Sequence, residues 1–397
     1  MNAVASGAAE RMPVRALAGL ALGNFAVGTG ALVIAGVLPD VAADLQVPPA
    51  AAGQLITVYA LSYAVGAPLL GAAASRLDRR RLLIGAGLLY ALANLLAALS
   101  ASFGMLLAAR VLGSVGAALF SPTAATVASM LVAPALVPRA IGLVFGGFVI
   151  STVLGVPLGT WIGTTWGWQV ALLFVSGLTV IATGVVALTL PGGLKAEGAG
   201  IGALVSTLKN TRLLVALSVA ASNMASQFIP FTYIAVLLAA FSGATKDDVT
   251  VLFFAFGLAS VVGNWLGGRA AARFGLTPTL LAGMLTLPVL FFALPAMHWG
   301  VTAAGVLLAL WGMAGFSFSA PNQSRLVALA PHLRGVLLSL HASALYAGQA
   351  VGAAVGAFVL QTGTMDDLGW AAGIAALVTV ALFLLSLWQW RPGTRGT

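Results

Sequence analysis

Arg110 is the residue whose chemistry most needs an explanation, because it lies inside an apolar run at 103–131 that is long enough to cross a bilayer. A guanidinium in hydrocarbon costs about 2.5–3.5 kcal/mol on insertion scales and does not escape that cost by losing its proton. Arg110 must therefore face an aqueous cavity, backbone carbonyls or an anionic group. We expect it to contact a solute or to take part in coupling; the alternative is a side chain that snorkels to the interface.

Other polar side chains also lie in apolar runs, where they can bind a solute or hydrogen-bond one helix to another. Asn223 and Gln227 are four residues apart, and Tyr346 and Gln349 are three apart, so each pair should share a helix face. Part of the set should bind solute and the rest should tie helices together. The candidates for substrate binding or coupling are Arg110, Asn24, Thr29, Ser151, Thr152, Asn223, Gln227, Tyr233, His341, Tyr346 and Gln349, with Asn322 as a further cavity residue and Phe231, Phe256 and Trp311 as apolar walls.

Enzyme chemistry finds no support in the motifs. The chain has no GxxxxGK[ST] phosphate loop, no HExxH and no GxSxG, and it contains no cysteine. Its three histidines, at 298, 332 and 341, are too scattered for a recognisable metal site. We expect no catalytic residue, no metal and no cofactor, so the protein is predicted not to be an enzyme or an ATP-driven pump subunit.

The composition requires lipid as the solvent. Charged residues make up 7% of the 397 residues, against about 25% in soluble proteins, and hydrophobic residues make up 60%. A soluble fold of this length could not bury that much apolar surface. The net charge of +9 would suggest nucleic acid in a soluble chain, but the basic residues are spread over short loops. We therefore expect membrane lipid, and no nucleic acid, as a partner.

Apolar runs of about 20 residues predict an all-α membrane protein. Twelve spans are expected, at 16–38, 51–74, 82–100, 103–131, 140–164, 169–190, 213–240, 249–268, 279–297, 301–324, 336–360 and 370–390. When the N-terminus is placed inside, 16 of the 18 lysines and arginines fall in the two tails and the inner loops. The positive-inside rule then predicts a multi-pass membrane protein with both termini cytoplasmic.

The segment 191–212 is the longest and most polar linker, and it divides the chain into six spans and six. We expect an N-terminal bundle at 1–190, a cytoplasmic linker at 191–212 and a C-terminal bundle at 213–397. The sequences at 71–76 and 268–273 share four residues at equivalent loops, 197 positions apart. This spacing indicates a duplication, and two similar halves are typical of secondary transporters.

Residues 71–80 are similar to the loop signature GxxxDRxGRR of the major facilitator superfamily, although Ser75 stands at its aspartate and Asp78 at its second glycine. Arg110, followed by Gly113 and Gly116, resembles the superfamily's signature on the fourth span. Together with a motif on span 5, described next, these signatures extend the resemblance over essentially the whole chain. It implies the major facilitator fold, with twelve transmembrane helices in two pseudo-symmetric six-helix bundles.

The run from Gly155 through Pro157 to Gly159 resembles the Gly-Pro-Gly motif that exporters carry on span 5. By resemblance, the glycine of the loop signature would let spans 2 and 11 approach closely, and the arginines would bind helix C-termini and lock one conformation. The simpler alternatives are positive-inside anchoring for the arginines and tight helix packing for the span 5 motif. The residues assigned to gating are Gly71, Ser75, Arg76, Asp78, Arg79, Arg80, Gly155, Pro157 and Gly159.

The segments 36–45, 53–54 and 59–60 resemble the bacterial arabinose- and sugar-efflux branch near the drug–proton antiporters. That branch usually has a glutamate on span 1, where this chain has Ala31. All nine acidic residues are expected in tails or loops, so the membrane carboxyl group that commonly carries protons is missing. His341 could titrate instead, Asp40 or Asp44 could serve if span 1 runs longer, or transport could proceed without protons.

The resemblance implies a monomeric secondary transporter of the bacterial cytoplasmic (inner) membrane that exports its solute by alternating access. Because the expected cavity carries few charges apart from Arg110, we expect a small neutral polar or amphipathic solute, such as a sugar, metabolite or antibiotic. Exchange for protons is one coupling left open. The alternatives within transport are an uncoupled facilitator, a solute exchanger and an importer of a small solute. From another class, the alternative is a membrane sensor that keeps the same fold without transporting. Fold alone does not identify the substrate.

Overall fold

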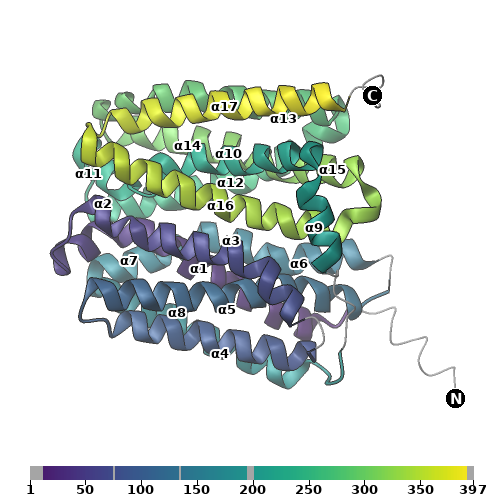
Figure 1. The fold of residues 1–397 in the computed structure, drawn as a ribbon. Coiled ribbons are helices and arrows are strands. Elements are labelled where there is room, and N and C mark those ends of the chain that lie inside the picture. The colour runs from purple at the N-terminus through teal and green to yellow at the C-terminus, as the bar shows by residue number, and fades with distance from the viewer. Residues whose placement is uncertain (1–11, 75–76, 134–135, 195–200, 391–397) are drawn as a thin grey trace, which may run out of the picture. The chain divides into compact units, whose positions relative to one another are not determined.

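A computed structural model describes residues 12–74, 77–133, 136–194 and 201–390. Throughout these ranges the chain forms helices joined by short connections, with no β-strand among the residues described. Figure 1 shows these helices. The predicted all-α membrane fold class is confirmed.

The helices follow the predicted spans closely. Eleven helical segments in the described part of the chain are long and apolar enough to cross a membrane, and the shorter Leu276–Phe292 stands where the ninth span was predicted. The helices are α1 Val14–Asp44, α2 Pro49–Ala52, α3 Gln54–Ala73, α4 Arg79–Ala98, α5 Phe103–Met130, α6 Val137–Ile150, α7 Val156–Trp166, α8 Trp168–Thr189, α9 Ile201–Lys209, α10 Thr211–Phe231, α11 Ile234–Ser242, α12 Lys246–Phe274, α13 Leu276–Phe292, α14 Val301–Ser317, α15 Ser319–Leu329, α16 Arg334–Thr362 and α17 Asp367–Gln389.

Several predicted boundaries were wrong. The first helix continues through Pro39 to Asp44, because a proline inside a membrane helix can be accommodated by its neighbours. Asp40 and Asp44 are therefore helical, and Asp367 begins α17, although loops were expected for all three. Arg325 was assigned to a loop and lies buried in α15. The linker contains the helix α9, which its polar composition did not suggest.

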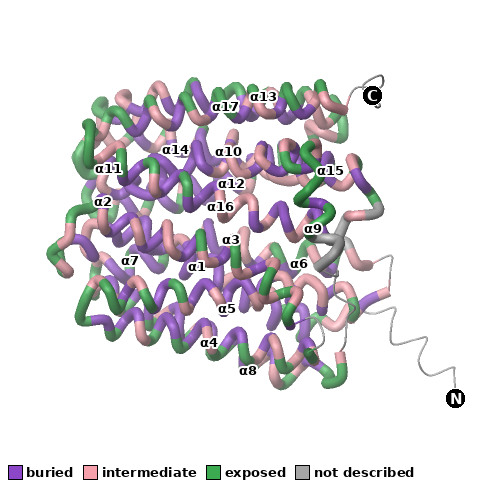
Figure 2. Tube along the Cα trace, viewed as in Figure 1, coloured by how far each residue is buried: buried purple, intermediate pink, exposed green. Residues whose placement is uncertain are grey.

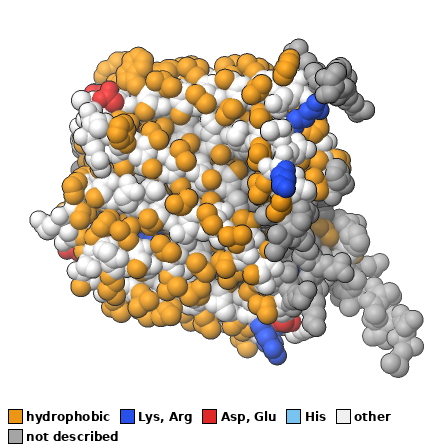
Figure 3. All heavy atoms as spheres, in the orientation of Figure 1, with side chains coloured by type: hydrophobic (Ala, Val, Ile, Leu, Met, Phe, Trp, Pro, Cys, Tyr) orange, Lys and Arg blue, Asp and Glu red, His pale blue; other side chains and the backbone are white. Residues whose placement is uncertain are grey.

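The exposed surface is what lipid contact requires. Large apolar side chains point outward along the helices, including Leu188, Val289 and Phe358, which are 87%, 66% and 65% exposed. Hydrophobic side chains cover most of the face drawn in Figure 3, and the few charged ones lie mostly near its margins. Figure 2 shows exposed and buried residues alternating along many of the helices, whereas α1 is buried over most of its length. The protein is a multi-pass membrane protein.

The described chain divides into two compact units. Unit 1 comprises residues up to Val37 and Val65–Gly198, and unit 2 comprises Leu38–Ala64 and everything from Ala199. The end of α1, α2 and the first part of α3 thus belong with the C-terminal helices. The domain boundaries predicted from the linker stay a prediction.

In unit 1, α1 packs closely along α6 and α7. A Cβ on Gly147 would collide with the carbonyl oxygen of Ala21, and one on Gly159 would lie 2.7 Å from Val33 Cγ2. These glycines let two helix backbones approach, which is how membrane helices gain contact area without a hydrophobic driving force.

Unit 2 repeats this arrangement between α10 and α16. A Cβ on Gly348 would collide with the carbonyl oxygen of Ala221, and Gly352 stands in the same relation to Ala225. Gly348 and Ala221 lie about 200 positions after Gly147 and Ala21. The duplication inferred from the loops thus reappears in the helix packing inside each unit.

Candidate functional site

Arg110 is buried in unit 1 and bound to backbone oxygens of α1. Its side chain is 3% exposed, and Nη1 donates to the carbonyl oxygen of Gly30 at 2.8 Å while Nη2 donates to that of Ala31 at 3.4 Å. Tyr90 of α4 approaches the same stretch, since its hydroxyl donates to the carbonyl oxygen of Val27 at 3.1 Å. An aqueous cavity, backbone carbonyls or an anionic group were expected to face this guanidinium, and the structure shows backbone carbonyls. Its burial argues against a side chain that snorkels to the interface.

Four of the sequence candidates lie where α1 meets the fifth span. Asn24 Nδ2 donates to the carbonyl oxygen of Val144 at 3.1 Å, which ties α1 to α6. The hydroxyls of Thr29, Ser151 and Thr152 each donate to a carbonyl of their own helix, at 2.8, 2.6 and 2.7 Å. All four side chains are buried. Because the three hydroxyl protons are already used, Thr29, Ser151 and Thr152 serve helix packing in this structure. Asn24 Oδ1 is buried without a hydrogen-bond partner among the described residues.

A π-turn interrupts the fifth span at Ser151–Gly155, directly before Pro157. Proline has no N–H for the carbonyl four residues earlier, and such turns often occur at functional sites. Gly155 and Gly159 pack against Thr29 and Val33 of α1. The motif therefore packs helices tightly and also carries a break in hydrogen bonding at which the span can bend.

In unit 2, Asn223 and Gln227 of α10 do share one face, as their spacing predicts. Gln227 Nε2 donates to Asn223 Oδ1 at 3.0 Å, and Trp311 Nε1 of α14 donates to Gln227 Oε1 at 3.3 Å. Phe231 and Phe256 pack around Trp311 with ring centroids 6.0 and 5.7 Å away. The predicted apolar walls are thus one buried aromatic cluster joined to a buried amide network.

Several polar side chains of unit 2 are buried without full hydrogen bonding, among them Arg325 and Ser343 as well as the three described next. His341 of α16 is 3% exposed and Asn322 of α15 is fully buried, and neither the two ring nitrogens nor the amide atoms have a partner among the described residues. Gln349, 5% exposed, leaves its Nε2 unbonded in the same way. Buried polar groups are normally bonded, so orphaned ones need an explanation, and a bound solute is one.

Asn322 and His341 each lie, along the chain, between residues of the same two apolar clusters of unit 2. Along α15, Asn322 is one turn from Phe318 and one turn from Leu326; along α16, His341 lies between Leu340 and Leu345. Leu326 and Leu340 pack in one apolar cluster, while Phe318 and Leu345 pack in the next. We call Asn322 and His341 the polar layer, since they stand between these two clusters.

Tyr233 and Tyr346 hold the segment 38–64 in unit 2. Tyr346 stacks on Tyr63 with ring centroids 3.7 Å apart. Tyr233 stands at the break between α10 and α11, donates to the carbonyl oxygen of Ala353 at 3.2 Å, and leaves no room for a Cβ on Gly53. Both tyrosines therefore contact protein in this structure, apart from the polar layer.

The acidic residues do not supply a buried carboxyl group in the described part of the chain. Asp40 Oδ1 accepts from Lys246 Nζ at 2.6 Å, with side chains that are 26% and 62% exposed. Asp44 is exposed at the end of α1. The longer first helix thus brings Asp40 into unit 2 as the partner of a lysine.

The loop residues assigned to gating bind helix ends. Arg79 Nη1 donates to the carbonyl oxygen of Ala74, just after α3, at 3.4 Å, and Arg80 Nη2 donates to that of Ala187, near the end of α8, at 2.6 Å. Asp78 caps α4 by accepting from the backbone N–H of Arg81 at 3.0 Å, and this hydrogen bond lowers the pKa of Asp78. Guanidinium groups at helix C-termini were expected from the resemblance.

The structure does not test two parts of the gating prediction. A Cβ on Gly71 would meet no heavy atom within 4 Å. The approach of spans 2 and 11 expected there would join the two units, and it stays a prediction. Ser75 and Arg76 lie outside the described residues.

The sequence suggested Asn322 only as a further cavity residue, and it did not suggest that Lys246 would pair with Asp40. Both positions depend on residues distant in the chain, and no local motif marks them. The end of α1 beyond Pro39 could have been anticipated from the acceptance of proline in membrane helices.

The comparisons with known proteins agree with this architecture. The Major Facilitator Superfamily model matches residues 20–353. The chain is 31% identical over 347 residues to the inner membrane transport protein YdhP of Escherichia coli K12 (87% of this chain, 89% of the relative). It is 32% identical over 378 residues to a chloramphenicol resistance protein of Streptomyces lividans (92% and 94%), and 28% identical over 367 residues to a probable sugar efflux transporter of Helicobacter pylori (92% of each).

Among solved structures, a bacterial homologue of the human lysosomal transporter Spinster, in an inward-facing and unoccupied conformation, is similar in fold. Its TM-score is 0.72 at 16% identity, over 95% of this chain and 97% of the other. With the helical architecture and the family match over most of its length, the chain belongs to the major facilitator superfamily of membrane transporters, and not to an enzyme family.

Proposed function

We propose that this transporter exports a small neutral polar or amphipathic solute by alternating access. The observation that carries the proposal is the polar layer: Asn322 and His341 are buried with hydrogen-bonding atoms that no described residue satisfies. Leaving such groups unpaired costs about 1–3 kcal/mol each, so a fold retains them where a solute can bind them.

The chemistry of the buried groups indicates the solute class. Imidazole and amide groups offer donors and acceptors without a fixed charge. No described carboxyl group is buried, so a cationic solute would lack a counter-ion. The aromatic cluster around Trp311 adds apolar surface. A sugar, a polar metabolite or a neutral antibiotic has the matching mixture of hydroxyl and apolar groups.

Arg110 has a separate role in this proposal, as the coupling residue of unit 1. Its guanidinium donates to two carbonyl oxygens of α1, those of Gly30 and Ala31. A rotation or bend of α1 changes those two hydrogen bonds, so the guanidinium ties the position of α1 to that of α5. We propose that Gly155, Pro157 and Gly159 allow the accompanying bend, and that Asp78, Arg79 and Arg80 hold one of the two states.

Export and drug resistance are supported by the names of relatives, one a chloramphenicol resistance protein and one a probable sugar efflux transporter. We propose exchange for protons as the coupling, with His341 as the buried group that takes up the proton. A second candidate is an uncoupled facilitator, because no described carboxyl group is buried. We further propose a monomer in the bacterial inner membrane with both termini cytoplasmic.

Thermal unfolding of the purified protein with a compound panel tests the proposal. A ligand raises the melting temperature by mass action, so a panel of sugars, phenicols, purines and amphipathic drugs should contain stabilising compounds. The shift should disappear in His341→Leu and persist in Ser242→Ala, a matched loss of one polar group at a helix end. Stabilisation of both variants by the same compound would contradict a binding role for the polar layer.

A further inference from the structure

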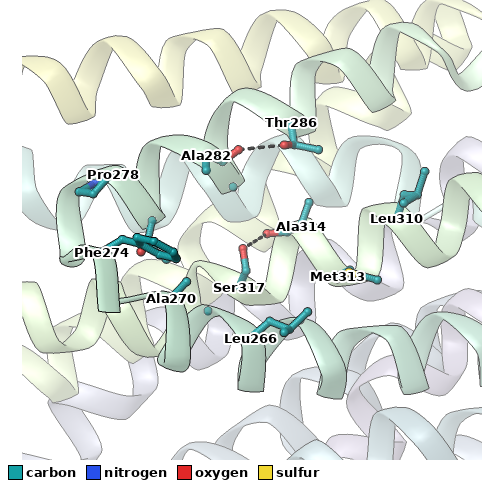
Figure 4. A pocket seen from close by; sticks show the side chains of 14 residues that line it. Leu266, Ala270, Phe274, Pro278, Ala282, Thr286, Leu310, Met313, Ala314 and Ser317 are labelled. Carbon is teal, nitrogen blue, oxygen red and sulfur yellow. Dashed lines mark hydrogen bonds between the residues drawn. The ribbon is translucent and has the colours of Figure 1, made fainter. Parts of the chain in front are cut away.

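Unit 2 contains an apolar groove that plays no part in the proposed transport site. It has a volume of about 490 Å3 and lies between α12, α13 and α14. Figure 4 shows Phe274 and Pro278 toward one end and Leu310 toward the other. A volume of this size is within the range of small-molecule sites, about 300–1,000 Å3.

The groove offers almost no free hydrogen-bonding group. Three hydroxyls line it, and each donates to its own helix: Thr279 to the carbonyl oxygen of Gly275 at 2.8 Å, Thr286 to that of Ala282 at 2.9 Å, and Ser317 to that of Ala314 at 2.7 Å. Two of these bonds are drawn in Figure 4. A polar solute would therefore lose its hydration in this groove without replacement, whereas a hydrocarbon chain would not.

The groove has exposed walls on membrane-spanning helices and has the length of one leaflet. Its walls include Leu266, Phe274 and Leu310, which are 41%, 65% and 44% exposed on membrane-spanning helices. Along α12 it extends from Gly263 to Phe274, about 16 Å at the helical rise. Half of the hydrocarbon core is about 15 Å thick, so an acyl chain anchored at the Phe274 end would fill the groove.

Two arginines stand at that end of α12. Arg273 lies three residues from Ala270 and seven from Leu266, at the edge of the helix face that lines the groove, and its guanidinium lies over the Phe274 ring at 5.3 Å. The Arg269 guanidinium lies over the Trp265 ring at 4.3 Å. Both arginines are exposed, and neither forms an ion pair with a carboxylate of the described residues.

We propose that this groove is a binding site for one anionic phospholipid, with an acyl chain between α12, α13 and α14 and the phosphate at Arg269 and Arg273. Two features indicate this occupant. The arginines at one end complement a negative charge, and the rest of the groove is apolar and as long as one leaflet. Arginine binds phosphate oxygens through its planar fork of donors, and each basic residue near the surface strengthens binding to anionic lipid.

Lipid retention by the purified full-length protein tests the site. Native mass spectrometry in neutral detergent would count molecules of dioleoyl phosphatidylglycerol and dioleoyl phosphatidylcholine that stay bound. We expect one phosphatidylglycerol to bind about tenfold more tightly than phosphatidylcholine. Arg269→Gln with Arg273→Gln should reduce phosphatidylglycerol to the level of phosphatidylcholine, while Arg15→Gln, at an exposed arginine of α1, should not.

Filling the groove tests the acyl chain separately. Ala282→Phe puts a ring into the groove from an exposed position on α13 and should abolish retention of both lipids, whereas Leu258→Phe, at a 49% exposed position of α12 outside the groove, should not. Unchanged retention in Ala282→Phe, or in the double arginine variant, would overturn the proposal. If Ala282→Phe does not fold, photo-crosslinking by a phosphatidylglycerol with a photoreactive acyl chain decides: labelling of α12–α14 supports the site, and labelling elsewhere overturns it. Neither readout depends on transport.

Discussion

Arg110 Nη1 donates to the carbonyl oxygen of Gly30 at 2.8 Å, so this buried guanidinium of α5 is hydrogen-bonded to the backbone of α1. The neighbouring carbonyl, that of Ala31, accepts from Nη2. Ala31 is the position at which the sugar-efflux branch usually carries a glutamate. The guanidinium is thus hydrogen-bonded to the backbone of the residue at which that branch carries its acid.

Replacement of Arg110 should impair transport more than folding. After Arg110→Ala the two carbonyl oxygens still belong to a helix. What the variant loses is the pair of hydrogen bonds to the guanidinium, and a hydrogen bond to a charged group contributes about 1.5–3 kcal/mol. We expect transport to fall by about tenfold or more at equal protein levels. Arg110→Lys should recover only part, because an ammonium lacks the planar fork that reaches two carbonyls. Initial transport rates in membrane vesicles measure this, and a wild-type rate in Arg110→Ala would refute the assignment.

His341→Leu should leave the protein as stable as before or more stable, while solute binding is lost. Neither ring nitrogen has a partner among the described residues, so an apolar side chain of similar size removes a desolvation cost without breaking a bond. Gln227→Leu is the contrasting variant, since it leaves Trp311 Nε1 and Asn223 Oδ1 unpaired and should cost about 1–3 kcal/mol. Melting temperatures compare the two. A large destabilisation in His341→Leu would mean that the imidazole is a structural residue.

Glycine substitutions should separate packing positions from open ones. Alanine at Gly147 or Gly348 places a Cβ against a helix carbonyl, and overpacking of this kind costs about 1–3 kcal/mol. Alanine at Gly71 meets no atom within 4 Å and should fold normally. Monodisperse yield and melting temperature measure both effects. Equal stability of Gly147→Ala and Gly71→Ala would contradict the packing described for α1 and α6.

Neutralising Asp40 should leave proton coupling intact. Its carboxylate is paired with Lys246 near the surface, and exposed pairs contribute about 0–1 kcal/mol, so Asp40→Asn and Lys246→Gln should each change the transport rate by no more than about fivefold. In Asp40→Asn, transport should still respond to a pH gradient. Loss of that response would identify Asp40, and not His341, as the proton carrier.

The helices could be predicted from the sequence because lipid imposes one rule on every span. Each predicted span coincides with a helix or helix pair, and the errors lie where local composition competes with packing. Pro39 suggested an end to the first span, yet α1 continues to Asp44. The break at Tyr233 and the π-turn at Ser151–Gly155 were not predicted, since the apolar pattern runs through both without a change.

The candidate site could be predicted only as a set of residue types. Arg110 stands out because a charge among apolar residues is conspicuous, but its partners are backbone oxygens, which leave no mark in a sequence. Thr29 and His341 look equally suitable as polar residues in apolar runs. The structure separates them, because the Thr29 hydroxyl is bonded to Phe25 while the His341 nitrogens are orphaned. That difference depends on neighbours and not on the residue itself.

The most direct test of solute export is uptake into everted membrane vesicles of a compound that stabilises the purified protein. With an acidic vesicle interior and no added ATP, the account predicts that the compound accumulates above its outside concentration. The same compound should release protons, reported by dequenching of acridine orange, and both signals should be lost in Arg110→Ala and His341→Leu. Equilibration without accumulation would favour the uncoupled facilitator, and no movement of a compound that binds would contradict the account.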